Sequence, residues 1–334
     1  MACASVAVLL SSCGPPSTQF SILPTSQGVY MGSTANNKVD ILWVIKNSGT
    51  MYTKQQLLAS GFSSFISNFT QGNFDYQMGV ITGDLTASGQ GGILQGAPSI
   101  LIPTTPSLSS VFATNVEVGD TGSFNQTPFD ATELGLGTAL LSGANSGFIR
   151  SGAQLAVIFV SDSDMDYSTA TPSTTAANLY TFLNTLKPPV YNLTTEKYTP
   201  AFTVSAVIAD DTRSDFVLND CKFMGAPIYE NGLAFESLVG MTAGSVAQIC
   251  SSDFSSGLTT ISNSIVQAIT EIKLGRVPDT STIVVTFNGV VVPQSSSNGW
   301  TYDSVNNQIL FSGTGIPQTD TQINIDYTPS TIIL

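Results

Sequence analysis

Histidine is absent from this sequence of 334 residues. Its absence excludes catalysis by Ser-His-Asp or Cys-His arrangements, zinc or haem ligation through imidazole, and pH switching by imidazole. Charged residues are also scarce, at 10% of the chain, where soluble domains usually carry about 25%. Neutral polar side chains must therefore cover most of the surface.

Basic residues are the scarcer of the two charged classes. The chain has 10 Lys and Arg against 23 Asp and Glu, which gives a formal net charge of -13. Nucleic-acid binding needs clustered Lys and Arg to neutralise phosphates, so this balance argues against a nucleic-acid partner and is compatible with cation binding. The hydrophobic fraction of 42% and the length allow one large domain or two smaller ones.

The N-terminus has the features of an export signal. Residues 1–12 (MACASVAVLLSS) form an apolar run that is far shorter than the roughly 20 residues needed to span a bilayer. Such a run with small residues at its end is typical of a signal peptide. The tetrad Leu10-Ser11-Ser12-Cys13 resembles the lipobox of bacterial lipoproteins, which implies cleavage before Cys13 and lipidation of its thiol and amine. An ordinary signal peptide with an incidental cysteine is the alternative.

Residues 13–37 carry no charged side chain and are rich in Pro, Ser, Thr and Gly. This composition predicts a tether between the lipid anchor and the folded part. No later segment has an apolar run long enough to span a bilayer, so acyl chains would be the anchor. Gly14 is not an acidic retention signal, and by analogy with lipoproteins the outer membrane of a bacterial envelope is the expected location.

The body of the chain alternates between strand and helix patterns. Continuous apolar, β-branched runs predict buried strands at 39–45, 76–82, 155–161 and 202–209. Helical spacing predicts helices at 57–69, 131–142, 174–186, 231–239 and 253–274, whereas 83–128 reads as loops around one apolar run at 99–102. This alternation predicts an α/β fold over 38–275, with a doubly wound, mostly parallel sheet covered by helices on both faces.

The last part of the chain changes character. Short alternating segments such as TFNGVVVP, NQILFSG and TQINIDYT are separated by Asn-Gly, Asn-Asn and Gly-Thr-Gly turns. These are signals of antiparallel hairpins. A small antiparallel β domain, sandwich-like in architecture, is predicted over 277–334.

Three loops that follow predicted strands or open a predicted helix carry the recognisable chemistry. They are 46–51 (KNSGTM), 130–135 (DATELG) and 161–166 (SDSDMD). In a doubly wound sheet, ligands bind beyond the carboxyl ends of the strands. Each loop alone is also explained by helix capping or a solvated turn, but their order along the chain favours one shared site.

With these loops, residues 38–275 resemble the von Willebrand factor A (VWA) domain. The resemblance implies a metal-ion-dependent adhesion site with oxygen ligands only, which suits Mg²⁺ or Ca²⁺ and needs no histidine. It assigns Ser48 and Thr50 as hydroxyl ligands from the first loop, Thr132 from the second and Asp162 from the third. Asp164 and Asp166 are possible additional acidic ligands.

Lys46 departs from the family pattern, because it stands where VWA domains have their first metal-site Asp. A protonated lysine cannot ligate a cation and repels one. Three interpretations are open. The site is inactive and the domain is a scaffold; the Lys46 ammonium takes the place of the metal and pairs with Asp162 or Asp164; or the three aspartates from Asp162 to Asp166 bind Ca²⁺ without the first loop.

Two of the four cysteines, Cys221 and Cys250, lie in the predicted folded part. An even number in an exported chain favours a disulfide, which would contribute about 3 kcal/mol on the chain-entropy model. The segment around Cys250 and the C-terminal strand motifs also resemble bacterial VWA lipoproteins.

Enzymatic motifs are weak. No Gly-x-Ser-x-Gly, Gly-x-Gly-x-x-Gly or Walker A signature fits a strand-to-helix turn, and no enzyme activity is expected. The resemblance implies an envelope-anchored binding or adhesion protein that engages a protein partner, through an acidic side chain, at the VWA loop face. The alternative is a structural subunit of an envelope assembly with a non-functional metal site.

Overall fold

The computed structural model describes most of the chain beyond residue 36. The described residues are 37–86, 91–123, 126–164, 174–192, 197–209, 222–223, 226–227, 232–318 and 321–330. The predicted signal segment, the tether up to residue 36 with Cys13, and also Asp166 and Cys221, lie outside them. Among the described residues, no helix is long and apolar enough to cross a membrane.

A six-stranded sheet forms the centre of the main unit. Its strand order is β10-β7-β4-β1-β2-β3, with five strands parallel and β3 antiparallel at one edge. The strands are β1 Lys38–Ile45, β2 Asp75–Thr82, β3 Ile100–Leu101, β4 Gln154–Val160, β7 Phe202–Ile208 and β10 Val246–Gln248. The predicted α/β class with a doubly wound, mostly parallel sheet is confirmed, and the central strands are buried on both faces as their apolar runs require.

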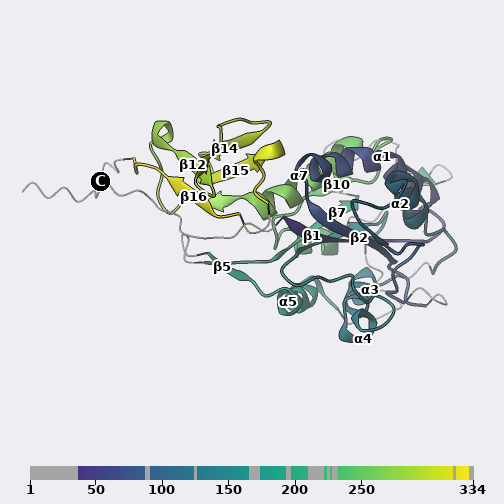
Figure 1. Cartoon of the computed structure of the whole chain (residues 1–334). Coiled ribbons are helices and arrows are strands. Elements are labelled where there is room, and N and C mark those ends of the chain that lie inside the picture. Colours follow the sequence, from purple (N-terminus) through teal and green to yellow (C-terminus); the bar gives the residue numbers. More distant parts are fainter. Residues whose placement is uncertain are drawn as a thin grey trace, which may run out of the picture.

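Helices cover both faces of this sheet (Figure 1). Because side chains alternate along a strand, one set from β1 packs with α1 (Tyr52–Gln71), α2 (Leu108–Val116) and α7 (Ser255–Thr270). The other set packs with α3 (Pro128–Gly135), α5 (Ala176–Leu186) and α6 (Leu233–Val239), and the short α4 (Thr138–Leu141) follows α3. Each face thus has its own hydrophobic cluster.

Aromatic rings fill the cluster under α1 and α2. Trp43 of β1 meets Phe65 and Phe112 edge-on, with ring centroids 4.9 and 5.5 Å apart. Phe112 belongs to α2, which lies in the segment that the sequence predicts as loops. The apolar residues of α2 recur at helical spacing, but this short stripe is flanked by Gly-, Pro- and Thr-rich sequence that hides it.

Two predicted helices differ in extent from the observed ones. The helix predicted over 131–142 is divided into α3 and α4, which are separated by Leu136 and Gly137. The helix predicted over 253–274 ends at Thr270, and Ile272–Lys273 is instead strand β11, which pairs with β15. The apolar spacing of the segment continues past the helix end because Ile272 is buried in the same cluster as α7.

The C-terminal part contains two three-stranded antiparallel sheets. One has the order β11-β15-β14 and the other β13-β12-β16. Their strands are β12 Val284–Phe287, β13 Val290–Val291, β14 Gly299–Asp303, β15 Gln308–Ser312 and β16 Ile323–Asp326, with short 3-10 helices η1 Thr280–Thr282 and η2 Gly313–Gly315. Phe287 and Phe311 join the two sheets with ring centroids 5.4 Å apart. Small antiparallel sheets near the C-terminus are therefore confirmed.

The remaining strands form two small ribbons, β5 (Val190–Asn192) with β6 (Lys197–Thr199), and β8 (Lys222–Phe223) with β9 (Ala226–Pro227). The hydrophobic cluster on the α1 side continues from the main sheet into the C-terminal sheets. The C-terminal part therefore packs directly against the main unit, beside α7 and the end of α1 (Figure 1).

Candidate functional site

The candidate site lies where the strand order of the main sheet reverses. Along the chain, β2 is added on one side of β1 and β4 on the other side. The loops that leave the carboxyl ends of β1 and β4 therefore diverge, and ligands of doubly wound sheets bind at this point. The first and third predicted loops are these two loops.

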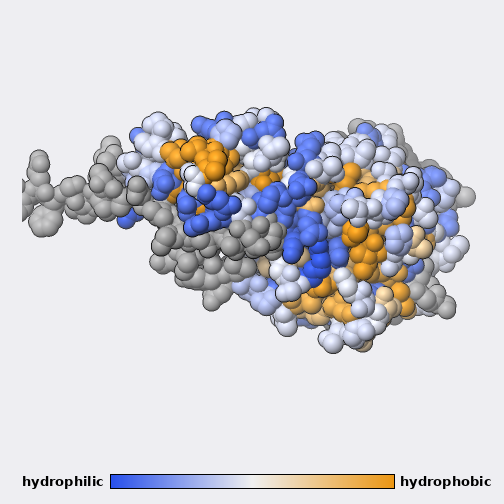
Figure 2. All heavy atoms as spheres, in the orientation of Figure 1, coloured by the Kyte–Doolittle hydropathy of each residue, from blue (hydrophilic) through white to orange (hydrophobic). Residues whose placement is uncertain are grey.

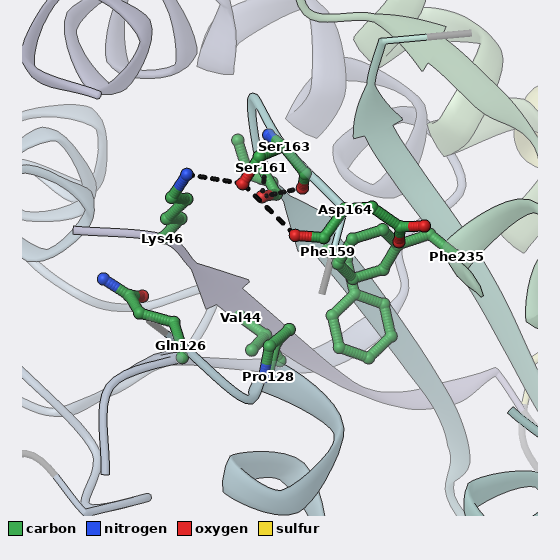
Figure 3. A pocket seen from close by; sticks show the side chains of 11 residues that line it. Val44, Lys46, Gln126, Pro128, Phe159, Ser161, Ser163, Asp164 and Phe235 are labelled. Atoms are coloured by element: carbon green, nitrogen blue, oxygen red, sulfur yellow. Dashed lines mark hydrogen bonds between the residues drawn. The ribbon is translucent and has the colours of Figure 1, made fainter. Parts of the chain in front are cut away.

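The side chain of Lys46 extends from the first loop to the third loop. Its backbone N–H donates to Val160 O at 3.0 Å, which continues the pairing of β1 with β4. Its ammonium donates to Asp162 Oδ1 at 2.9 Å and to Ser163 Oγ at 2.6 Å. Figure 3 shows Lys46 directed at Ser163 across the space between the loops. The positive charge that replaces the family carboxylate is thus paired with the predicted third-loop aspartate.

This ion pair is buried. Only 8% of Lys46 and 5% of Asp162 is exposed. A buried pair is not a large net source of stability, but removal of one partner leaves an uncompensated charge and is strongly destabilising. The pair therefore links the ends of β1 and β4 across the site.

The hydroxyl groups of the first loop differ in their surroundings. Ser48 is 2% exposed, and its Oγ has no hydrogen-bond partner among the described residues. Thr50 is half-buried, and Gly49 between them is exposed. The chain then enters α1, where Met51 N donates to Ser48 O at 2.9 Å. An unpartnered buried hydroxyl in a folded protein is uncommon, and it stands where the resemblance places a metal ligand.

The second loop contributes a residue that the sequence did not single out. Thr132 lies inside α3, fully buried, and its Oγ1 donates to Pro128 O at 2.7 Å. Gln126, just before that helix, instead faces the first loop: its Nε2 donates to Asn47 Oδ1 at 2.8 Å. No sequence motif assigns a role to Gln126. Only its place just before the Thr-Pro start of a helix could have suggested that it contributes to the site.

Two further acidic residues stabilise the surrounding loops. Asp164, a predicted extra ligand, accepts from Ala234 N at 3.3 Å, at the start of α6. Its negative charge is favourable there because a helix N-terminus carries partial positive charge. Asp84, which the sequence did not single out, is fully buried and accepts from Ser123 N at 2.7 Å. The sequence signal for Asp84 was only its place directly after β2.

The loops leave little internal space. The cavity beside Lys46 has a volume of about 10 Å³ and is also lined by Gln126, Pro128, Ser161 and Phe235 (Figure 3). This is about the space that one water molecule requires.

The donor set does not fit a divalent cation while Lys46 is protonated. Its ammonium sits 2.9 Å from Asp162 Oδ1, and would repel a cation bound to the same carboxylate. Of the other proposed ligands, Ser48 and Thr50 bring neutral oxygens only, and the Asp164 carboxylate already accepts from Ala234 N at the start of α6. Within the part of the chain that the structure describes, no cluster of three or more Asp, Glu, Cys or His could hold a metal. Among the described residues, the buried and unpartnered Ser48 hydroxyl stands at a position where the resemblance expects a ligand.

Cys250 is in a disulfide. Its predicted partner, Cys221, lies outside the described residues. The pairing of these two cysteines stays a prediction.

No family model and no curated protein matches the sequence. Among solved structures, proximal thread matrix protein 1 from the mussel byssus is similar to this chain, with 12% identity, a TM-score of 0.37, and coverage of 74% of this chain and 52% of that protein. One structure of that protein has a zinc-occupied MIDAS motif.

Two pilus adhesins are also similar. SpaC from Lactobacillus rhamnosus GG has 14% identity and a TM-score of 0.34, with 89% of this chain and 39% of that protein covered. RrgA from Streptococcus pneumoniae has 8% identity and a TM-score of 0.31, with 90% and 57% covered. The chain thus spans roughly half the length of these proteins. With such low identities and TM-scores, the fold assignment stands on the strand order and helix layers described above.

Proposed function

We propose that this chain is a non-enzymatic binding protein of a bacterial envelope, which engages a protein partner through the loop face at the carboxyl ends of β1 and β4. In this proposal Lys46 is a built-in cation that fixes the loops where a VWA domain would use a metal. The observation that carries the proposal is the buried contact of Lys46 Nζ with Asp162 Oδ1, at 2.9 Å. Of the three interpretations of Lys46, this geometry favours the second.

The exposed rim of the loop face supplies the contact surface in this proposal. Gly49 is exposed and Thr50 is half-buried, whereas Lys46 and Asp162 lie beneath them. The partner therefore touches the rim, and the ion pair beneath keeps the rim in its binding shape. Preorganisation of this kind lowers the cost of ordering loops on binding. The lipid anchor on Cys13 and the outer-membrane location belong to this proposal as well.

An adhesion assay tests the proposal. Beads coated with the chain are applied to surfaces that carry immobilised envelope or matrix protein preparations. Gly49→Arg is the blocking variant, because a Cβ at Gly49 meets only Asp120 O, at 3.7 Å, so the fold tolerates it. Thr181→Arg, at an exposed position of α5, is the matched control. We expect Gly49→Arg to abolish adhesion, Thr181→Arg to keep it, and EDTA to leave it unchanged.

A metal titration tests the role of Lys46. Calorimetry with Mg²⁺ or Mn²⁺ should show no binding at this face of the natural chain. Lys46→Asp removes the ammonium and supplies the carboxylate that the family has, next to the unpartnered Ser48 hydroxyl. That variant should gain Mg²⁺ or Mn²⁺ affinity. Adhesion that is lost in EDTA, or metal binding by the natural chain that Asp162→Asn removes, would contradict the built-in cation.

A further inference from the structure

A second concave site lies at the opposite end of α1, between the main unit and the C-terminal sheets. This groove has a volume of about 410 Å³. Asn68 and Gln71 of α1 and Asn263 and Gln267 of α7 line one side, and residues of β14 and β15 line the other. Asn68 lies 16 residues beyond Tyr52, where α1 begins next to the loop face. This separation corresponds to about 24 Å along the helix axis.

The polar part of the lining of this groove is uncharged. Four side-chain amides and five hydroxyl-bearing residues surround it, and no Asp, Glu, Lys or Arg is among the lining residues. Figure 2 shows hydrophilic surface in a band between the C-terminal sheets and the main unit. A groove without a cation compensates the desolvation of a phosphate or a carboxylate less well than one that contains Lys or Arg. The uncharged lining therefore favours a neutral ligand over an anionic one.

Several of the polar groups have no protein partner. The side chains of Gln71, Ser296 and Thr301 make no hydrogen bond with any residue that the structure describes. Asn68 Nδ2 donates to Asn263 Oδ1 at 2.6 Å, which fixes the relative orientation of these two amides. Amides and hydroxyls both donate and accept hydrogen bonds, so the groove presents groups of both kinds to a ligand.

Part of the lining of the groove is apolar. Phe311 and Ile316 are each only 4% exposed, whereas Val266 and Leu310 are half-buried and contribute apolar surface. A peptide ligand usually depends on pockets for apolar or charged side chains, and no charged residue lines this groove. A volume of about 410 Å³ is in the usual range for sites of small ligands, and such sites are frequent between structural units.

We propose that this groove binds a neutral oligosaccharide. Sugar hydroxyls donate and accept hydrogen bonds and carry no charge, which matches the amides and hydroxyls of the lining and in particular the unpartnered side chains of Gln71, Ser296 and Thr301. The proposal is independent of the proposed function, because the loop face and the groove lie at opposite ends of α1. Adhesion through the loop face can therefore fail while the groove still binds, and the reverse also holds.

Saturation-transfer NMR and calorimetry on the full chain test this proposal. The probes are neutral tetrasaccharides built from glucose, mannose or N-acetylglucosamine, a heparin tetrasaccharide as the anionic probe, and an uncharged Gly-Ser peptide. Gln71→Ala removes one exposed amide, and Thr301→Trp fills the groove from β14. Thr260→Ala, at an exposed position of α7 outside the groove, is the control.

We expect at least one neutral tetrasaccharide to bind, with affinity reduced about tenfold by Gln71→Ala and abolished by Thr301→Trp. The control should bind like the natural chain. The proposal is overturned if no neutral probe binds, if the heparin probe or the peptide binds more tightly than every neutral sugar, or if neither groove variant weakens sugar binding. Circular dichroism and unfolding midpoints confirm that both groove variants are folded.

Discussion

Replacement of Lys46 by methionine tests the ion pair at the loop face most directly. Methionine keeps most of the apolar stem and removes the ammonium. Asp162 is 5% exposed, and Lys46 is its hydrogen-bond partner among the described residues. The variant therefore leaves a buried carboxylate without its partner. Breaking a buried pair by removal of one partner costs about 3 to 5 kcal/mol. Since Lys46 and Asp162 keep 8% and 5% exposure, we expect the lower end, about 3 kcal/mol of unfolding free energy.

A double-mutant cycle separates the pair from other effects of substitution. Lys46→Met and Asp162→Asn should each destabilise the chain, but the double variant should lose less than the sum, with a coupling energy of about 2 kcal/mol. Urea unfolding followed by tryptophan fluorescence is a suitable assay, because Trp43 lies on the neighbouring strand β1 and is fully buried. The coupling should persist in 1 M NaCl, since a buried pair is screened far less than an exposed one.

The control for this cycle is Arg276→Met. Arg276 is exposed and makes no ion pair with a residue that the structure describes, so its loss should change the unfolding free energy by less than about 0.5 kcal/mol. Strict additivity of the two single substitutions at the loop face, within measurement error, would refute the reasoning. So would a Lys46→Met variant that is as stable as the natural chain.

Two predictions concern other buried charges. Asp40 is fully buried near the amino end of β1, where its carboxylate lies 2.7 Å from Arg150 Nε and 3.6 Å from Lys187 Nζ. Asp40→Asn should therefore cost about 3 kcal/mol in urea unfolding, and an equal stability of the variant would contradict this. Burial raises the pKa of Glu271 above 4.5; folding then favours the protonated form, so this group lowers stability as pH rises from 4.5 toward its raised pKa. Glu271→Gln should therefore raise the thermal midpoint relative to the natural chain at pH 7 but not at pH 4, and an equal difference at both pH values would count against it.

Sequence patterns were sufficient for the four inner strands of the main sheet, β1, β2, β4 and β7, because these strands are largely buried, whereas the short edge strands β3 and β10 were not predicted. A run such as Val39–Ile45 has no polar alternation, so it predicts a central parallel strand, and the structure confirms it. The apolar pattern did not predict helix α2. Of the apolar residues in this short helix, only Phe112 and Val116 are buried. Local propensity is weak in so short a helix, and tertiary packing decides it.

The candidate site was predictable only in part. The resemblance placed Lys46 and Asp162 on neighbouring strand ends, and the structure brings them into contact. It could not supply Gln126 or Asp84, because the hydrogen bonds between these side chains and the loop backbone depend on loop conformation and follow no spacing rule. A sequence motif describes ligands, whereas the residues that hold loops in place are determined by the particular path of each loop.

The ion pair also changes what binding at the loop face would depend on. In the site that the resemblance implies, a partner carboxylate completes the coordination of a divalent cation. Here Lys46 is 8% exposed and its ammonium contacts Asp162 and Ser163, so a partner at the rim meets Gly49 and Thr50 rather than a bare charge. Rim contacts without an exposed cation depend on shape and neutral hydrogen bonds. Under the proposed function, adhesion should therefore change little between 50 mM and 500 mM NaCl, whereas capture of a carboxylate by an exposed cation would weaken strongly over that range.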